Sequence, residues 1–154
     1  MKHSGLTLIE LLVALVILSI LIATGVPGMQ TLLANIAIRS NTEKLVGSFA
    51  YARGEAVARV NNVSVRTNNW ADGWTVFLDQ NGSCTIDIDD EILRDVDISE
   101  EGIAIAANPL ALNCVSFNRY GENADTAERT FNFTKASGTA RLVRVSNIGY
   151  TSID

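Results

Sequence analysis

The longest apolar stretch of the chain covers residues 6–26. Its single charged side chain is Glu10, and as an α-helix it would span about 30 Å, the thickness of the hydrocarbon core of a bilayer. This pattern predicts a transmembrane helix. The preceding residues 1–5 are too few for the charged and apolar regions of a signal peptide that is removed as a whole.

Residues 27–60 keep the period of an amphipathic helix. The apolar positions with this spacing are Met29, Leu32, Leu33, Ile36, Leu45, Val46, Phe49, Ala52, Ala56, Val57 and Val60. Most charged residues of the segment fall on other faces of such a helix. We therefore expect residues 27–60 to continue the helix and to lie against a globular head.

Two places weaken this helix. Pro27 removes a backbone donor and clashes with the preceding turn, and Gly28 follows it, so a kink or a melted turn is expected there. Ser40 and Glu43 have the spacing of a capping box, which would start a new helix. Because the apolar stripe continues on both sides of Ser40, we favour one continuous helix with a weak joint.

From Asn61 onward the apolar residues follow a period of two. Seven candidate strands are separated by clusters of Asn, Gly, Asp and Ser: residues 63–67, 74–79, 91–98, 103–107, 114–118, 130–134 and 141–146. A long helix followed by short strands predicts an α+β protein, with a small antiparallel β-sheet or β-sandwich head in residues 61–154. Trp74, Val76 and Leu78 would share the core face of the second strand.

Charge changes this picture little. The 12 basic and 17 acidic residues give a net charge of −5, so no overall positive field attracts nucleic acid. The charges are segregated, because residues 39–66 and 129–144 are mainly basic and residues 87–101 are mainly acidic. Such blocks are typical of solvated faces, and in a protein that docks onto others they would select the partner.

Cys84 and Cys114 are the two cysteines of the chain. An even count in an exported domain favours one disulfide, which would close a long loop, and a buried pair of free thiols is the alternative. The spacing matches neither a redox motif nor a zinc site.

The sequence predicts no catalytic residue, metal site or cofactor. Its one histidine is His3. If residues 1–5 are removed by processing, the remaining chain has no histidine, and a Ser/His or Cys/His catalytic pair is excluded. The acidic loop that begins at Asp79 resembles a calcium loop, but an EF-hand needs glycine at its sixth position, where this chain has Cys84.

Residues 5–13, GLTLIELLV, are followed by an apolar helix and Pro27. This combination resembles the processing and assembly segment of type IV pilins and type II secretion pseudopilins, although Leu6 stands where most members carry Phe. The resemblance implies that prepilin peptidase cuts after Gly5, that Leu6 becomes the N-methylated N-terminus, and that Thr7 and Glu10 serve assembly. Glu10 would then pair with the α-amine of an adjacent subunit.

Two further segments resemble the GspH/FimT family of pseudopilins and minor pilins. They are the helix core at residues 52–56, ARGEA, and the strand at residues 73–79, GWTVFLD, with the later segment EILR at residues 91–94. The resemblance implies a leader in residues 1–5, a transmembrane assembly helix in residues 6–26, an amphipathic continuation in residues 27–60 and a periplasmic head in residues 61–154.

For function, the resemblance implies a minor subunit of a pseudopilus or pilus that helps initiate or cap the filament. The subunit would span the bacterial inner membrane once, and its partners would be prepilin peptidase, other pilins or pseudopilins and the inner-membrane assembly platform.

Two alternatives remain open at this point. In the first, the chain is a membrane-anchored periplasmic binding module that never polymerises. In the second, a cut near residues 23–25 releases a secreted head. Some relatives in DNA uptake contact DNA through arginines around a C-terminal glycine. No arginine follows Gly149 here, and DNA contact would depend on Arg141 and Arg144, expected on one face of a strand, so DNA binding is not favoured.

Overall fold

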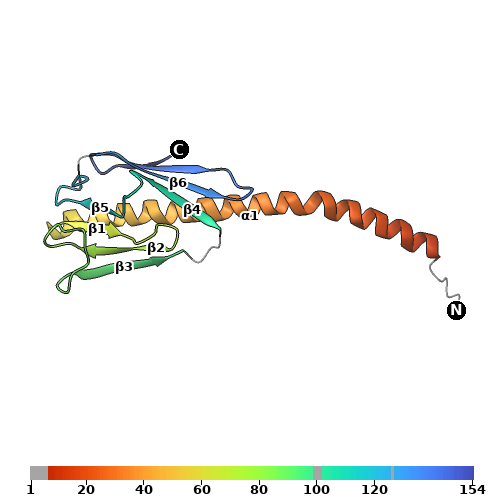
Figure 1. Cartoon of the computed structure of the whole chain (residues 1–154), viewed down its shortest axis with the longest axis horizontal. Coiled ribbons are helices and arrows are strands. Elements are labelled where there is room, and N and C mark those ends of the chain that lie inside the picture. The colour runs from red at the N-terminus through yellow and green to blue at the C-terminus, as the bar shows by residue number, and fades with distance from the viewer. Residues whose placement is uncertain (1–6, 99–101, 126) are drawn as a thin grey trace.

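The computed structural model describes residues 7–98, 102–125 and 127–154. Within these residues one helix, α1 (Leu8–Arg59), projects far beyond a head of β-strands that packs against its C-terminal half (Figure 1). The strands are β1 (Val63–Arg66), β2 (Gly73–Leu78), β3 (Glu91–Asp97), β4 (Ile103–Asn108), β5 (Cys114–Phe117), β6 (Arg129–Lys135), β7 (Arg141–Val145) and β8 (Thr151–Ile153). The predicted α+β class is confirmed.

Helix α1 is continuous over 52 residues, which corresponds to about 78 Å at the usual helical rise. The prediction of one helix across Ser40 is therefore confirmed, whereas a melted turn at Pro27 is wrong. A proline removes only one backbone donor, and the turns on both sides keep their own hydrogen bonds. The helix accordingly curves gradually in Figure 1 and does not break.

The face of α1 that meets the head combines small, polar and large apolar residues. Its buried members are Ala34, Ala37, Ile38, Asn41, Thr42, Leu45, Ser48, Phe49, Ala52 and Ala56, at intervals of three and four. The side chains of Asn41 and Thr42 donate to the carbonyl oxygens of residues 37 and 38, at 2.9 and 2.7 Å. Burial therefore leaves neither polar group without a partner.

The head-facing stripe differs in part from the predicted one. Met29, Leu32, Leu33 and Ile36 keep the helical period but remain 54–58% exposed. The turn after β6 approaches α1 so closely that a Cβ on Gly138 would lie 2.6 Å from Ile38 Cδ1 and 3.3 Å from Ala34 Cβ. This close contact leaves no room for a side chain at Gly138, and the stripe of Met29, Leu32, Leu33 and Ile36 lies on another face of the helix.

The eight strands form two antiparallel sheets. Sheet A has the order β3-β2-β1-β5, and sheet B has the order β4-β6-β7-β8. Each predicted strand is present with ends within one residue. The strand that sequence reasoning missed, β8, has only three residues, which is too short for a visible period of two.

Phe49 of α1 lies at the centre of the core between the helix and both sheets. Its ring centroid is 6.3 Å from that of Trp70, 6.1 Å from that of Phe117 in β5 and 5.3 Å from that of Phe131 in β6. Trp74 of β2 is buried beside this cluster and donates its indole N–H to Ser48 Oγ at 2.8 Å. One aromatic side chain of α1 thus joins the two sheets.

The outer face of sheet A has a smaller buried cluster of its own. As predicted, Trp74 and Val76 face the core, with Leu78 half-buried, but Phe77 on the opposite face is also fully buried. Ser64, its cross-strand partner, donates to Asp79 Oδ2 at 2.7 Å, and that carboxylate also accepts the backbone N–H of Cys84 at 2.9 Å. The loop after β2 therefore folds back over this face.

A disulfide between Cys84 and Cys114 fixes the same loop to β5, with a Cα–Cα separation of 6.1 Å. The Sγ atom of Cys84 lies 3.8 Å from Ser64 Oγ. The disulfide and the hydrogen bonds to Asp79 thus hold the loop after β2 against β1 and β5.

Truncating Phe49 to alanine should lower the free energy of unfolding of the head by about 3–5 kcal/mol, because a large side chain is removed from a closed cluster. Both tryptophans of the chain, Trp70 and Trp74, are buried in the head, so denaturant unfolding of the full chain in detergent can be followed by their fluorescence. The matched control is Leu32→Ala in the exposed part of the same helix, which should change the midpoint little. Equal effects of the two substitutions would contradict the assigned core.

Replacing both cysteines by serine should lower the free energy of unfolding by about 2–4 kcal/mol, because the reduced chain regains the freedom of the loop between residues 84 and 114. The same fluorescence assay measures this free energy of unfolding, and the wild-type chain under reducing conditions is the comparison. An unchanged midpoint in both samples would show that the bond does not stabilise the head.

Candidate assembly segment

Helix α1 begins with a capping box formed by Thr7 and Glu10. The Thr7 backbone N–H donates to Glu10 Oε2 at 2.9 Å, and the Thr7 hydroxyl donates to the same oxygen at 3.0 Å. In return, the Glu10 N–H donates to Thr7 Oγ1 at 3.4 Å. The carboxylate therefore lies at the positive end of the helix dipole and satisfies the Thr7 backbone donor, while the Thr7 hydroxyl oxygen satisfies that of Glu10.

This contact gives Thr7 a local role that sequence reasoning did not find. The signal was present, because a threonine three residues before a glutamate at the start of an apolar run is a capping-box pattern. The same pattern at Ser40 was identified instead, but Ser40 lies inside the helix and Glu43 pairs with Arg39 at 2.8 Å. The predicted cleavage residues, Gly5 and Leu6, lie outside the described residues.

Residues 8–26 of α1 are exposed along their whole length. By length and composition this part of α1 is able to cross a membrane. Its hydroxyls are satisfied within the helix, since Ser19 Oγ donates to Val16 O at 2.8 Å and Thr24 Oγ1 donates to Ile20 O at 3.1 Å. Both hydrogen bonds give the hydroxyl group a partner, because an unpaired polar group in hydrocarbon would cost free energy.

Exposed apolar side chains continue beyond residue 26. Met29, Leu32, Leu33 and Ile36 follow the apolar span at the point where the head begins to cover α1, and they remain 54–58% exposed. The head of the same chain leaves them uncovered. The helix therefore presents a continuous apolar surface that extends past the length of one bilayer.

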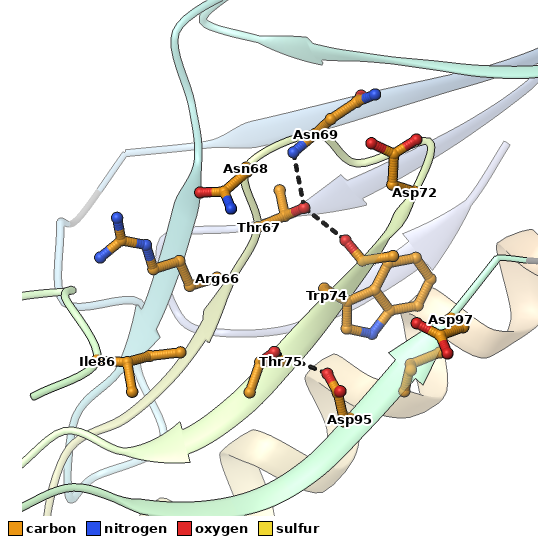
Figure 2. Close-up of a pocket in the computed structure, with 12 residues that line it drawn as sticks. Arg66, Thr67, Asn68, Asn69, Asp72, Trp74, Thr75, Ile86, Asp95 and Asp97 are labelled. Atoms are coloured by element: carbon orange, nitrogen blue, oxygen red, sulfur yellow. Dashed lines mark hydrogen bonds between the residues drawn. The ribbon is translucent and has the colours of Figure 1, made fainter. Parts of the chain in front are cut away.

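A polar cleft of about 250 Å³ lies where the ends of β1, β2 and β3 meet. Figure 2 shows the residues that line it. Its hydroxyls are already paired: Thr75 Oγ1 donates to Asp95 Oδ1 at 2.8 Å, and Thr67 Oγ1 accepts the Asn69 N–H at 3.0 Å while donating to Gly73 O. The residues that line it include no imidazole and no thiol.

The two arginines considered for DNA contact lie on opposite faces of β7. Arg141 is opposite Phe133 and Arg144 is opposite Thr130 in the register of β6 and β7, so the expectation of one shared face is wrong. Residues three apart in a strand point to different sides. Hydrogen bonds to Glu128 and Asp154 also raise the pKa of Arg144, which pairs with both carboxylates.

Other charges of the basic and acidic blocks also pair within the chain. Arg59 contacts both Glu55 in α1 and Glu91 in β3, each at 2.7 Å. Arg129 contacts Asp125 at 2.8 Å. The blocks are therefore partly neutralised in the folded head.

The family model described as type II transport protein GspH matches residues 41–149, and a prokaryotic N-terminal methylation motif matches residues 1–26. A search of curated proteins found no significant match. The methylation motif covers the apolar span and its capping box.

Three solved structures share the fold. The crystal structure of the type IV minor pilin FimU from Pseudomonas aeruginosa has a TM-score of 0.65 and 22% identity, over 76% of this chain and 87% of that chain. The minor pseudopilin EpsH from the type 2 secretion system of Vibrio cholerae has a TM-score of 0.56 and 12% identity, over 75% and 94%. The solution structure of GspH from Escherichia coli also has a TM-score of 0.56 and 12% identity, over 79% of this chain and 89% of that chain.

The resemblance predicted from the sequence is thereby confirmed, and the long helix with two small antiparallel sheets is the pilin-like fold of these proteins. An apolar N-terminal helix and pilin-like relatives fit a membrane-anchored protein. Because its model matches most of the sequence, the chain belongs to the GspH family of type II transport proteins.

Proposed function

We propose that this chain is a minor subunit of a type II secretion pseudopilus or a type IV pilus, and that it helps to initiate or cap the filament. Prepilin peptidase cuts it after Gly5, and Leu6 becomes the N-methylated N-terminus. The subunit waits in the bacterial inner membrane with its head in the periplasm, and the assembly platform then transfers it into a filament of other pilins. It carries out no enzymatic step.

The observation that carries this proposal is the exposed apolar half of α1, whose surface extends beyond one bilayer thickness. A plain anchor needs about 20 apolar residues. Here the apolar side chains at positions 29, 32, 33 and 36 continue the surface outside that length and stay uncovered by the head. A bundle of neighbouring subunit helices would cover both parts, because such helices offer apolar surface at every level of the filament.

Glu10 gives the assembly step its specificity. In the single subunit its carboxylate is held by the N–H and hydroxyl of Thr7, so it enters the membrane with neutral partners at hydrogen-bond distance. In the filament the α-amine at Leu6 of an adjacent subunit would add the opposite charge. An ion pair in a low-dielectric bundle is favourable only when both charges are present and aligned, which selects subunits that have been cut and correctly seated.

Replacing Glu10 by glutamine separates capping from charge. Glutamine still accepts the Thr7 N–H, but it cannot pair with an α-amine, so membrane insertion should be unchanged while incorporation into filaments falls at least about tenfold. The measurement is the amount of the chain in sheared filaments relative to membranes, determined by immunoblotting. Thr7→Ser, which keeps the cap and the charge, is the matched control and should assemble normally.

Normal incorporation of Glu10→Gln would remove the proposed role of the charge. Loss of membrane insertion in the same variant would show instead that the charge of Glu10 serves insertion and not assembly.

A bulky residue at position 5 should block processing. The chain with Gly5→Leu should remain about 0.6 kDa heavier than the processed wild type, the mass of the five leader residues, whereas Gly5→Ala should still be cut. Intact-mass spectrometry of the membrane-extracted protein measures both. A wild-type chain that retains Met1 would instead support the alternative of an anchored binding module that does not polymerise.

A further inference from the structure

The two sheets have four edge strands, and three of these edges are protected. Strand β3 carries Glu91, Arg94, Asp95 and Asp97, and strand β8 is only three residues long. The free side of β5 is covered by the following segment, since Ala124 N–H donates to Ser116 O at 2.8 Å and Asn118 N–H donates to Glu122 O at 2.9 Å. Charge, short length and cover are the usual means of preventing a sheet edge from pairing with another chain.

Among the residues that the structure describes, the fourth edge, β4, has none of these protections. Its sequence IAIAAN is uncharged and free of proline, and its register with β6 runs from Ile103 to Asn108 without a bulge. Among the described residues β4 pairs only with β6, so one side of this six-residue strand has no backbone partner in the ladder. An unpaired side of this kind presents alternating N–H and C=O groups, for which an extended strand is the matching ligand.

A groove of about 400 Å³ runs beside this edge. Strand β4 contributes Ile105 and Ala106, and the facing wall includes Trp70, Leu110 and Leu112. None of its eleven lining residues is Asp, Glu, Lys, Arg or His, although the head is rich in charge elsewhere. The groove is therefore suited to an uncharged peptide and would penalise a charged one.

The groove wall is fixed before any partner arrives. The Trp70 indole N–H donates to Leu112 O at 2.7 Å, and Thr67 N–H donates to Asn113 O at 2.9 Å. Leu110, by contrast, is 94% exposed at the mouth of this groove. A rigid wall with a protruding leucine provides an apolar contact for alternate side chains of an added strand.

We propose that the β4 edge accepts an extended, uncharged segment from the head of a neighbouring subunit, which adds a fifth strand to sheet B. Backbone hydrogen bonds to β4 supply the affinity, and the groove between Ile105 and Leu110 selects apolar side chains. The identity of the partner as another subunit rests on the proposed function, whereas strand addition rests on the edge itself.

Site-specific photocross-linking tests this assignment in cells that carry the remaining assembly genes. Leu110 is replaced by p-benzoylphenylalanine in the full chain, and Leu32→p-benzoylphenylalanine reports helix packing in the filament. Mass spectrometry then locates each adduct on its partner. The expected Leu110 adduct is an extended, uncharged segment of another subunit's head, and the expected Leu32 adduct is a neighbouring α1-type helix.

Two substitutions on adjacent strands sharpen the test. Ala106 of β4 and Asn132 of β6 are exposed cross-strand partners on the same face of sheet B. Ala106→Lys places a charge on the edge and should reduce the Leu110 adduct about tenfold, whereas Asn132→Lys, one strand inward, should leave it unchanged.

The outcomes separate this inference from the proposed function. Three results would overturn strand addition alone. They are a Leu32 adduct without a Leu110 adduct, a Leu110 adduct on a helix or a charged loop, and equal effects of the two lysine substitutions. Absence of both adducts would overturn strand addition and assembly together. A Leu110 adduct on an extended segment without a Leu32 adduct would support strand addition in a module that does not polymerise.

Discussion

Burial of the apolar surface of one helix is the constraint on which the rest of this structure depends. The C-terminal half of α1 buries its head-facing stripe, with Phe49 at the point where both sheets meet. The N-terminal half buries none of its apolar side chains within the described chain. A single element therefore requires two different environments, and only one of them is supplied by its own head.

The division between these environments depends on which face of α1 a side chain occupies. Ala34 and Ile38 lie under Gly138, while Met29 and Ile36 lie on another face of the helix and remain 56% and 55% exposed. Hydrophobic period alone gives the helix and its length but does not distinguish these two faces. Only the structure shows that the head leaves Met29, Leu32, Leu33 and Ile36 exposed.

Much of the fold could be predicted from the sequence because it depends on local patterns. The period of two located β1 to β7, and the bilayer-length run located the exposed half of α1. What failed depended on smaller or non-local signals. The cap at Thr7 was present in the sequence but not identified, β8 is too short to show a period, and the separation of Arg141 from Arg144 follows from odd spacing in a strand. The unprotected edge of β4 is visible only when sheet order is known, because edge strands are defined by pairing across the whole head.

The central claim is that this chain becomes part of a filament through its processed helix. Mass spectrometry of the chain in sheared, purified filaments measures this most directly. The account predicts a chain that begins at Leu6 with a methylated α-amine and is enriched in the filament fraction with other pilins. A chain that retains Met1 and remains entirely in the membrane fraction, while other subunits polymerise, would contradict it.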